Sequence, residues 1–413
     1  MVTYQDDIAF LYLMNYLLSC FKDEIYRLFI LLYRVLYLPI RVRQIRKKEI
    51  INVAFVLSEL GKWKTELLFR AMLSHQRFCP IIYVVPYSYE YDKDLEYLVD
   101  YLEKNGYPFR KMGFNQKFAN HLRPDILFYQ EPYSGNIRRN ILSLYCFVPY
   151  AFHTTDAKWF IDTPMLNIAW QVYYENSLAV KYVSRIMKNR GRNCYVTGLP
   201  YSDMFRQPLS LYPNPWKKQD GKKKRIIWAP HHTINSDRFV CHSTFLEYFE
   251  LLLSLAHKYK DDIQMAFKPH PVLKSKLYRI WGIERTDNYY SQWESGENIQ
   301  LVVGNYVPLF LYSDAMIHDC GSFTVEYHYT KKPVMYLVNE KFHEDNLNEF
   351  GRRAFELHYL GRNAKEIETF ITNIIKGKDD LKNARERFYQ ECLLPPNGNN
   401  ASDNIINAII SSN

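Results

Sequence analysis

Residues 315–338 of the chain read Ala-Met-Ile-His-Asp-Cys-Gly-Ser-Phe-Thr-Val-Glu-Tyr-His-Tyr-Thr-Lys-Lys-Pro-Val-Met-Tyr-Leu-Val. The stretch begins with a short apolar run that ends at Ile317, and a Gly-Ser turn follows. A helical segment near 322–330 then leads to a second apolar run over 334–338. Two buried strands joined by one helix are the repeating unit of a parallel sheet covered by helices. The stretch therefore predicts an α/β fold.

The same alternation extends along the chain in two series. The expected strands cover 51–57, 81–85, 125–129, 145–149, 166–170 and 194–197 in the first series, and 225–229, 263–267, 299–303, 315–317 and 334–338 in the second. The expected helices cover 58–74, 93–105, 177–189, 243–259, 322–330, 341–349, 364–376, 380–392 and 402–411. We expect two Rossmann-like αβα domains, with a ligand cleft between the carboxyl ends of the two sheets.

One segment interrupts the alternation. Residues 201–224 contain three prolines and a run of lysines, a composition that predicts a linker. The predicted organisation is an amphipathic helical segment over 1–48, an N-terminal Rossmann-like domain over 49–200, the linker over 201–224, a C-terminal Rossmann-like domain over 225–385 and C-terminal helices over 386–413.

Composition excludes several classes of protein. Hydrophobic residues make up 47% and charged residues 23%, as in a folded globular protein rather than a disordered one. The net charge of +9 suits an anionic partner. Neither GxGxxG nor GxxxxGK[ST] occurs, which argues against a dinucleotide-dependent dehydrogenase and a P-loop ATPase. The lysine run at 217–225 lacks interleaved aromatic residues, so we expect no nucleic-acid partner.

Cysteines and apolar stretches bear on the cellular compartment. The 7 cysteines are dispersed without a CxxC pair, which indicates reduced thiols in a cytosolic setting. The acidic Asp6 and Asp7 near the start do not fit a signal peptide. The longest uncharged stretches fall short of the roughly 20 residues that a membrane-spanning helix needs. We therefore expect no transmembrane helix.

The N-terminal segment has a different pattern. Residues 8–40 are rich in large apolar side chains, and Arg27 and Arg34 would lie within about 20° of each other on a helix. We expect Pro39 to end this helix. A basic tail follows, made of Arg41, Arg43, Arg46, Lys47 and Lys48. An apolar helix with a narrow cationic edge predicts an anchor on an anionic membrane surface. The alternative is a helical hairpin packed on the protein itself or on a partner chain.

Polar residues gather at four places where strands are expected to end. The four clusters are Tyr150–Asp156, Trp228–Thr233, Phe267–Pro271 and His318–Glu326. In the last cluster, Ser322 and Thr324 at the start of a helix would offer backbone N–H groups to an anion. Glu326 lies one helical turn beyond Ser322, where it could accept hydrogen bonds from ribose hydroxyls. The alternative is a helix-capping serine followed by a solvated glutamate.

Histidines dominate two of the other clusters. The prolines of Lys268-Pro-His270-Pro fix the backbone, so that His270 can be held beside an anionic group as a hydrogen-bond donor or proton shuttle. The alternative is an ordinary turn. His231 and His232 invite a zinc interpretation, but neighbouring side chains on an extended chain point to opposite faces. No third ligand occurs at motif spacing, and we therefore expect no metal.

Taken in order, these clusters resemble the CDP-glycerol glycerophosphotransferase family of teichoic-acid type polymerases and primases. That family carries a Pro/Trp motif after a strand, then K-x-H-P, then D-Y-S-S-x-x-x-D followed by K-P. The matching segments are Trp228–His232, Lys268–Pro271, Asp319–Glu326 and Lys332-Pro333. Gly321 replaces the first serine of the pair, and Glu326 replaces the closing aspartate. His153 is the nearest equivalent of the histidine in the family's W-H-G-T-P motif, and the resemblance covers residues 145–340.

The resemblance implies a GT-B fold, with an N-terminal acceptor domain and a C-terminal nucleotide-donor domain. It implies transfer of glycerol phosphate or another polyol phosphate from a CDP-activated donor to a surface polysaccharide or lipid-linked acceptor, at the cytoplasmic face of a bacterial membrane. No cofactor or metal is expected. The implied donor-binding residues are His231, His232, Lys268, His270, Asp319, Gly321, Ser322, Thr324 and Glu326. His270 and His153 are implied to be catalytic, with His153 acting from the first domain as general base.

Two other functions remain open at this point. A GT-B glycosyltransferase that uses a sugar nucleotide for capsule or lipopolysaccharide assembly would share the fold, and Gly321-Ser322 with Glu326 fits it as well. A non-catalytic scaffold of a polysaccharide assembly complex on the membrane surface would need no donor. A homo-oligomer of the expected transferase is also possible.

Overall fold

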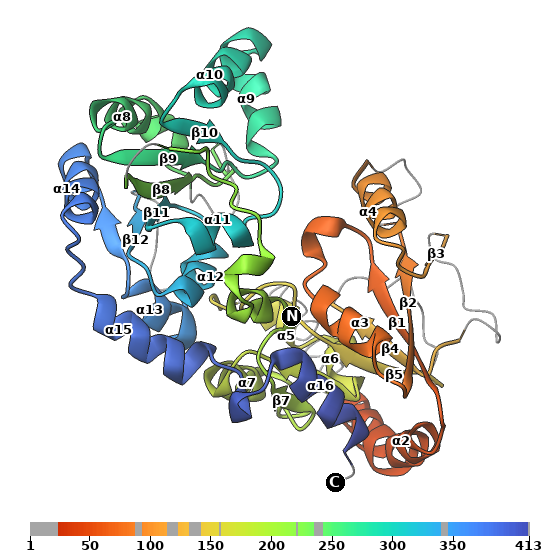
Figure 1. The fold of residues 1–413 in the computed structure, drawn as a ribbon. Coiled ribbons are helices and arrows are strands. Elements are labelled where there is room, and N and C mark those ends of the chain that lie inside the picture. The colour runs from red at the N-terminus through yellow and green to blue at the C-terminus, as the bar shows by residue number, and fades with distance from the viewer. Residues whose placement is uncertain are drawn as a thin grey trace, which may run out of the picture. The chain divides into compact units, whose positions relative to one another are not determined.

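The structure is a computed structural model that describes residues 24–86, 93–113, 123–131, 142–156, 158–219, 222–234, 243–339 and 346–411. Its contacts divide the chain into two compact units (Figure 1). The first unit comprises Met1–Tyr150, Ala157–Tyr201 and Pro395–Asn413, and the second comprises Ala151–Asp156 and Ser202–Leu394. Each unit contains one parallel sheet, as the sequence predicts.

The first unit is built on a sheet of seven strands in the order β3-β2-β1-β4-β5-β6-β7. Every pairing in it is parallel. The strands are β1 (Ile51–Leu57), β2 (Phe78–Val84), β3 (Phe109–Lys111), β4 (Ile126–Tyr129), β5 (Leu144–Phe147), β6 (Gln171–Tyr174) and β7 (Cys194–Val196). The order reverses between β1 and β4, as in doubly wound nucleotide-binding folds.

Helices surround this sheet. They are α2 (Leu38–Arg46), α3 (Glu66–Leu73), α4 (Lys93–Lys104), α5 (Lys158–Ile161), α6 (Pro164–Ile168), α7 (Ser177–Ile186) and α16 (Ala401–Ile410), with the short turn η2 (Leu60–Lys62). The C-terminal α16 packs against α3, although the two lie far apart in the sequence (Figure 1). The C-terminal helices were predicted as a separate part of the chain, but residues 395–413 belong to the first unit.

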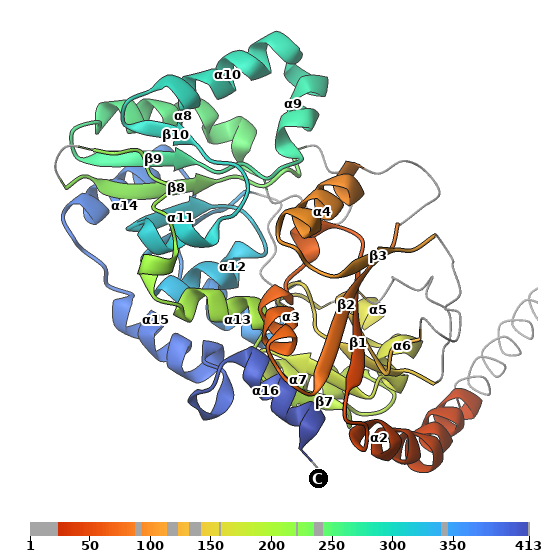
Figure 2. The same ribbon diagram turned by 45° about the vertical axis from the view of Figure 1, so that its right-hand side comes forward.

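The helix before β1 continues through Pro39, contrary to the prediction. Residues 24–32 are α-helical, η1 (Tyr33–Tyr37) is a π-helical turn, and α2 follows directly (Figure 2). The Leu38 N–H bonds to the Tyr33 carbonyl, five residues back. The wider turn accommodates a residue that has no N–H of its own and would crowd an ordinary α-turn.

This helix buries one side and exposes the other. Ile30, Leu38 and Ile45 are buried, and Arg34 Nη1 donates to the Ala169 carbonyl at 2.9 Å. Arg34 therefore faces the protein. The prediction that Arg34 and Arg27 together form a cationic edge of the helix is wrong. The exposed large apolar residues of the helix are Ile25, Leu28, Phe29, Leu31, Leu32, Val35, Leu36 and Ile40. Among the described residues, no helix is both long and apolar enough to cross a membrane.

The second unit repeats the topology of the first. Its six-stranded sheet has the order β10-β9-β8-β11-β12-β13, again with parallel pairings. The strands are β8 (Lys224–Ala229), β9 (Ile263–Phe267), β10 (Ile299–Leu301), β11 (Ala315–His318), β12 (Val334–Leu337) and β13 (Tyr359–Gly361). The order reverses between β8 and β11, the place where such sheets bind ligands beyond the carboxyl ends of the strands.

Its helices are α8 (Phe245–Lys258), α9 (Leu273–Trp281), α10 (Ile283–Ser295), α11 (Val307–Tyr312), α12 (Phe323–Glu326), α13 (Glu349–Phe355), α14 (Ala364–Ile375) and α15 (Lys382–Phe388). Its shorter turns are η5 (Leu209–Leu211), η6 (Tyr327–Thr330) and the π-turn η8 (Tyr389–Leu393). The turn η4 (Pro200–Arg206) spans the boundary between the units, and η9 (Pro396–Gly398) belongs to the first unit. Figures 1 and 2 show α9 and α10 together beside β10.

Within the predicted linker, the described residues 202–219 and 222–224 belong to the second unit. Trp216 is buried, and Lys217 Nζ donates to the carbonyls of Glu294 and Gly296 at the end of α10. A lysine at a helix C-terminus satisfies carbonyls that have no partner within the helix. This part of the chain therefore belongs to the packed body of the second unit.

Other differences from the prediction concern single elements. Residues 166–170 were predicted as a strand, but Pro164–Ile168 form α6, and the strand β6 follows it. Thr163 caps α6 by accepting the Leu166 N–H, and Pro164 occupies its first turn, a pattern typical of helix starts. The edge strands β3 and β13 and the helices α9, α10 and α11 were missed.

An aromatic core anchors the two strands that lead to the candidate site. Trp228 on β8 is fully buried and stacks on Phe267 of β9, with ring centroids 4.8 Å apart, and on Phe245 of α8 at 5.7 Å. Trp293 of α10 completes this packing. Truncation of a buried aromatic residue of this kind typically costs about 3–5 kcal/mol of stability. The ends of β8 and β9 are thus held firmly.

Candidate active site

Three strands of the second unit end in polar loops that lie at the switch point of the sheet. β8 leads to His231 and His232, β9 leads to Lys268 and His270, and β11 ends beside Asp319. The pairing of β8 and β9 continues past their ends, since the Lys268 N–H donates to the Trp228 carbonyl and the His270 N–H to the Pro230 carbonyl. The first two loops are therefore held side by side.

The three histidines form a cluster, which we call the histidine triad: His231, His232 and His270. One ring nitrogen from each lies within 4.8 Å of the others. The ring centroid of His232 lies 4.3 Å from that of His231 and 4.2 Å from that of His270. The prediction that His231 and His232 point to opposite faces is wrong. The chain turns after Pro230, where the Ile234 N–H donates to the His232 carbonyl, and the alternation of an extended strand does not apply.

Burial favours the neutral form of two members of the triad, His270 and His232. Burial is the largest cause, and together with the neighbouring His232, Lys268 and Lys276 it lowers the pKa of His270 to about 4. The pKa of His232 is lowered by burial and by Lys276. A neutral imidazole next to lysines can act as a hydrogen-bond donor to a negatively charged ligand.

The tautomer of His270 follows from its neighbour. The Val272 N–H donates to His270 Nδ1 at 3.2 Å, so Nδ1 is the acceptor nitrogen. In the neutral ring the proton must then reside on Nε2, which becomes a donor. A metal ion would need a lone pair at that nitrogen, whereas a phosphate oxygen needs the proton. Three histidines are enough ligands for a zinc site, but the tautomer and the nearby lysines favour an anion.

Asp319 ties the site together from within. Its carboxylate accepts the His231 N–H at 2.5 Å, the Thr244 N–H at 2.6 Å and the Thr244 hydroxyl at 2.9 Å. Burial raises its pKa to about 6, and these three hydrogen bonds act in the opposite direction. Asp319 was predicted to bind the donor. In the structure it is fully buried and fixes the loop after β8 to the start of α8.

The segment after Asp319 is helical but short. α12 contains four residues and continues as η6, so any dipole at its start is smaller than a long helix would provide. Ser322 and Gly321 are partly exposed, and Ser322 makes no capping hydrogen bond; its hydroxyl lies 3.3 Å from Cys320 Sγ. Thr324 is buried and donates its hydroxyl to the Cys320 carbonyl. Ser322 is thus better placed than Thr324 to reach a ligand.

Glu326 lies one helical turn after Ser322, as expected, since its N–H donates to the Ser322 carbonyl. Its side chain is only 2% exposed. It interacts with Tyr306, where burial and the Glu326 carboxylate together raise the pKa of the phenol. A role for Glu326 at the ribose stays a prediction.

His153 lies in the second unit, not in the first domain where it was predicted. Residues 151–156 pack against residues 346–351: the Asn348 N–H donates to the Thr154 carbonyl, and Thr155 and Leu347 form a β-bridge. His153 is 7% exposed, and burial lowers its pKa to about 4. Its imidazole is therefore neutral near pH 7 and able to accept a proton.

The two lysines of the quoted motifs have different surroundings. Lys268 is buried beside His270, whose pKa it helps to lower. Lys332 donates to the carbonyls of Phe310 and Leu311 at the end of α11, and burial lowers its pKa to about 8. The Lys332-Pro333 motif thus closes a helix in this structure. Sequence reasoning missed Thr244 and Tyr306, because neither stands in a recognisable motif.

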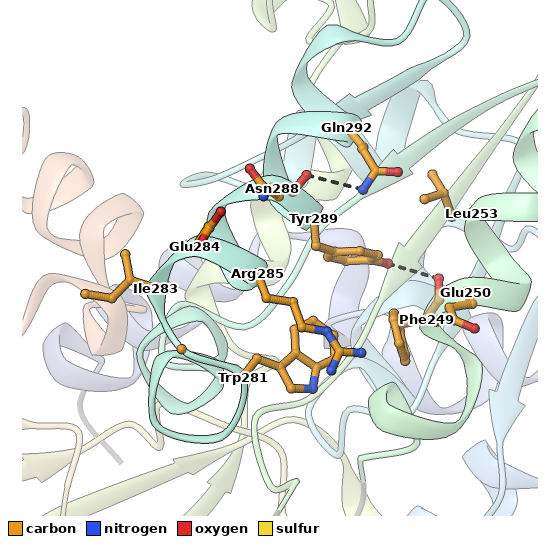
Figure 3. A pocket seen from close by; sticks show the side chains of 11 residues that line it. Phe249, Glu250, Leu253, Trp281, Ile283, Glu284, Arg285, Asn288, Tyr289 and Gln292 are labelled. Atoms are coloured by element: carbon orange, nitrogen blue, oxygen red, sulfur yellow. Dashed lines mark hydrogen bonds between the residues drawn. The ribbon is translucent and has the colours of Figure 1, made fainter.

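A separate cavity of about 690 Å³ lies between α8, α9 and α10 (Figure 3). Its walls include Trp281, Arg285 and Tyr289, and none of the predicted site residues lines it. The Arg285 guanidinium lies over the Trp281 ring at 4.6 Å, and the Tyr289 hydroxyl donates to the Phe249 carbonyl. The Trp281 ring face and the Tyr289 hydroxyl that line the cavity thus already have partners within the protein.

Two parallel sheets of Rossmann order define a GT-B-like α/β fold, and the second sheet carries histidines and a lysine beyond its strand ends. The sequence model of the CDP-glycerol:poly(glycerophosphate) glycerophosphotransferase family matches residues 175–411, more than half of the chain. The chain belongs to this family, and it is a CDP-glycerol glycerophosphotransferase-type transferase.

Solved structures with the same fold support the architecture. A variant of the wall teichoic acid polymerase TagF is 13% identical, with a TM-score of 0.57 over 95% of this chain and 97% of that one. A putative UDP-N-acetylglucosamine 2-epimerase from Listeria monocytogenes is 15% identical, with a TM-score of 0.56 over 88% and 96%. At these identities the likeness concerns the fold alone. No curated protein matches the chain.

Proposed function

We propose that this protein transfers glycerol phosphate, or another polyol phosphate, from a CDP-activated donor to a polysaccharide or lipid-linked acceptor of the bacterial cell envelope. One observation carries the proposal: the histidine triad at the switch point of the second sheet lies close to Lys268 and Lys276, and its member His270 presents an Nε2–H. These groups suit a diphosphate. Family membership supports cytidine as its nucleoside.

In the proposed reaction an acceptor hydroxyl attacks the phosphorus atom that carries the glycerol. A new P–O bond forms between the acceptor oxygen and this phosphorus. The bond from the same phosphorus to the oxygen that bridges the diphosphate breaks, and CMP leaves with that oxygen. The Nε2–H of His270 would donate to the diphosphate and stabilise the charge that develops on the leaving oxygen. Ser322 and the histidines after β8 would supply further donors. The proton released by the acceptor hydroxyl needs a base.

His153 is our candidate for that base. It is neutral near pH 7 because burial lowers its pKa to about 4, so it can accept the proton. Replacement by alanine should abolish turnover while CDP binding persists. A His153→Ala variant with full turnover would remove His153 from the mechanism and leave the donor site untouched.

A nucleotide panel tests the donor. We expect CDP to raise the unfolding temperature of the protein more than UDP or GDP does. His270→Ala should lose this effect, whereas His257→Ala should keep it, because His257 is an exposed residue near the end of α8. Stabilisation by UDP or GDP instead would favour the sugar-nucleotide glycosyltransferase. Binding of no nucleotide would favour the scaffold.

We also propose that the protein works at the cytoplasmic membrane surface through the helix before β1. The exposed apolar residues of that helix, with Arg41, Arg43, Lys47 and Lys48 after them, fit an anionic lipid surface. Leu28→Asp with Val35→Asp should abolish flotation with phosphatidylglycerol vesicles. Leu211→Asp, at an exposed leucine of the second unit, is the matched control. Equal flotation of all variants would overturn the membrane proposal.

A further inference from the structure

A second group of histidines lies in the interior of the second unit, away from the triad. His318, at the end of β11, and His358, just before β13, are both buried. Their Nε2 atoms are 3.2 Å apart. His358 belongs to none of the predicted polar clusters; His318 opens the fourth one but was given no role, and it immediately precedes Asp319 and the loop that leads to Ser322.

The neighbours of these two rings fix their protonation. His358 Nδ1 lies 3.0 Å from the Ala354 carbonyl and 3.1 Å from the Phe355 carbonyl, and since carbonyls only accept, this nitrogen carries a proton. His318 Nδ1 accepts the Cys320 N–H at 3.1 Å and carries none. The two Nε2 atoms can therefore bond in one way only: the Nε2–H of His318 donates to His358 Nε2.

The result is a continuous hydrogen-bonded chain from the end of α13 to the site loop. It runs from the carbonyls of α13 through His358 and His318 to the N–H of Cys320. The Tyr336 hydroxyl also bonds to the Asp319 carbonyl at 3.3 Å. Asp319 in turn holds the His231 N–H, so the chain ends where the donor loops begin.

We propose that His358 is a positioning residue for the donor site: by accepting from His318 it fixes the loop from Asp319 to Ser322. This inference rests on the proposed function of that site. His358 itself touches no substrate and acts through His318. Both rings must stay neutral, because a proton on His358 Nε2 would face the N–H of His318.

The surroundings support neutrality. Burial and, to a smaller extent, Arg385 lower the pKa of His358 to about 3, although the hydrogen bonds to the α13 carbonyls act in the opposite direction. His328, whose ring lies 4.8 Å from that of His358, is buried as well, with its pKa lowered by burial and by His358. Arg385 is itself fully buried and paired with Asp379.

Two amide substitutions separate the roles of the two nitrogens in His358. A glutamine places a polar atom near the position of Nε2, and an asparagine near that of Nδ1. His358→Gln can still accept from His318, whereas His358→Asn keeps only the bond to α13. We expect CDP to bind His358→Gln within about twofold of the wild type, and His358→Asn on the order of tenfold more weakly.

His328→Asn is the matched control. His328 is equally buried and donates to the same Ala354 carbonyl as His358, but it does not stand between that carbonyl and His318. This substitution should lower the unfolding temperature without changing the dissociation constant for CDP. If His328→Asn weakens CDP binding as much as His358→Asn does, the effect is general loosening and the proposal fails.

A double-mutant cycle completes the test. His318→Asn retains an acceptor for the Cys320 N–H but cannot donate to His358. If the two histidines act as one unit, the double variant should bind CDP no more weakly than either single variant. All affinities are measured by calorimetry well below each unfolding temperature. Wild type that does not bind CDP overturns the proposed function; wild-type binding with unchanged affinity in His358→Asn overturns only the role of His358.

Discussion

The two units share one topology, but their strand ends carry opposite chemistry. At the switch point of the first sheet, Lys62 is engaged by two carboxylates, Glu59 at 3.1 Å and Glu131 at 2.9 Å. At the equivalent point of the second sheet stand the histidine triad and Lys268, and the acid nearby, Asp319, is occupied by backbone donors. The first sheet ends in paired charges, and the second in hydrogen-bond donors.

This difference shows how two units of one topology can favour different ligands. Strand order places the switch point, but the residues that follow the strands decide which ligand is favoured there. A diphosphate would meet repulsion from Glu59 and Glu131 in the first unit and donors in the second. The comparison can be tested by changing each side separately.

The largest effect is expected at His270. Removal of its Nε2–H by His270→Ala should lower kcat/KM for CDP-glycerol by about 100-fold or more, as loss of one donor to a developing charge does in other enzymes. Steady-state kinetics with the exposed His257→Ala as control measure it. A loss below threefold would mean that the triad is not the donor site.

Changes of pH should have a smaller effect than His270→Ala. Lowering the pH should raise the affinity for CDP-glycerol but lower the stability of the fold. Because His270 has a folded pKa of about 4, below the 6.5 of an unfolded histidine, the unfolded chain takes up protons first, and stability should fall as pH drops from 6.5 towards 4. A bound diphosphate favours the imidazolium, so affinity for CDP-glycerol should rise about tenfold between pH 8 and 5. Calorimetry and thermal unfolding over this range measure both. Affinity that is independent of pH would contradict the proposed contact.

In the first unit, Glu131→Gln should barely change the affinity for CDP. It removes a carboxylate from Lys62 in the first unit, where no diphosphate is expected to bind. We expect CDP affinity within about twofold of the wild type. A tenfold change would show that the donor contacts the first unit.

Metal removal should have the smallest effect. In His270, Nδ1 accepts the Val272 N–H, so Nε2 carries the proton and has no free lone pair for a metal ion. Prolonged dialysis against EDTA should therefore leave CDP affinity unchanged, as calorimetry can show. Loss of binding that zinc restores would identify the triad as a metal site instead.

Much of the fold could be predicted from sequence, because buried strands and amphipathic helices differ in period. The strand predicted at 166–170 shows the limit of this approach, because a short apolar run fits a helix as well as a strand. The Thr163-Pro164 pair just before it is typical of a helix start and was the signal to use. Short edge strands such as β13 carry too few residues for a pattern.

The candidate site was less predictable. The triad residues were identified from motifs, but their convergence depends on a turn after Pro230 that spacing does not reveal. His153 was identified and assigned to the wrong unit, because its partners lie near residue 348. His358 left no signal, since its partner is 40 positions away and no motif joins them.

The most direct test of the central claim is a crystal structure of the protein with CDP bound. We expect the diphosphate within hydrogen-bonding distance of His270 Nε2, beyond the ends of β8 and β9. A diphosphate bound beyond the ends of β1 and β4, beside Lys62, would contradict it.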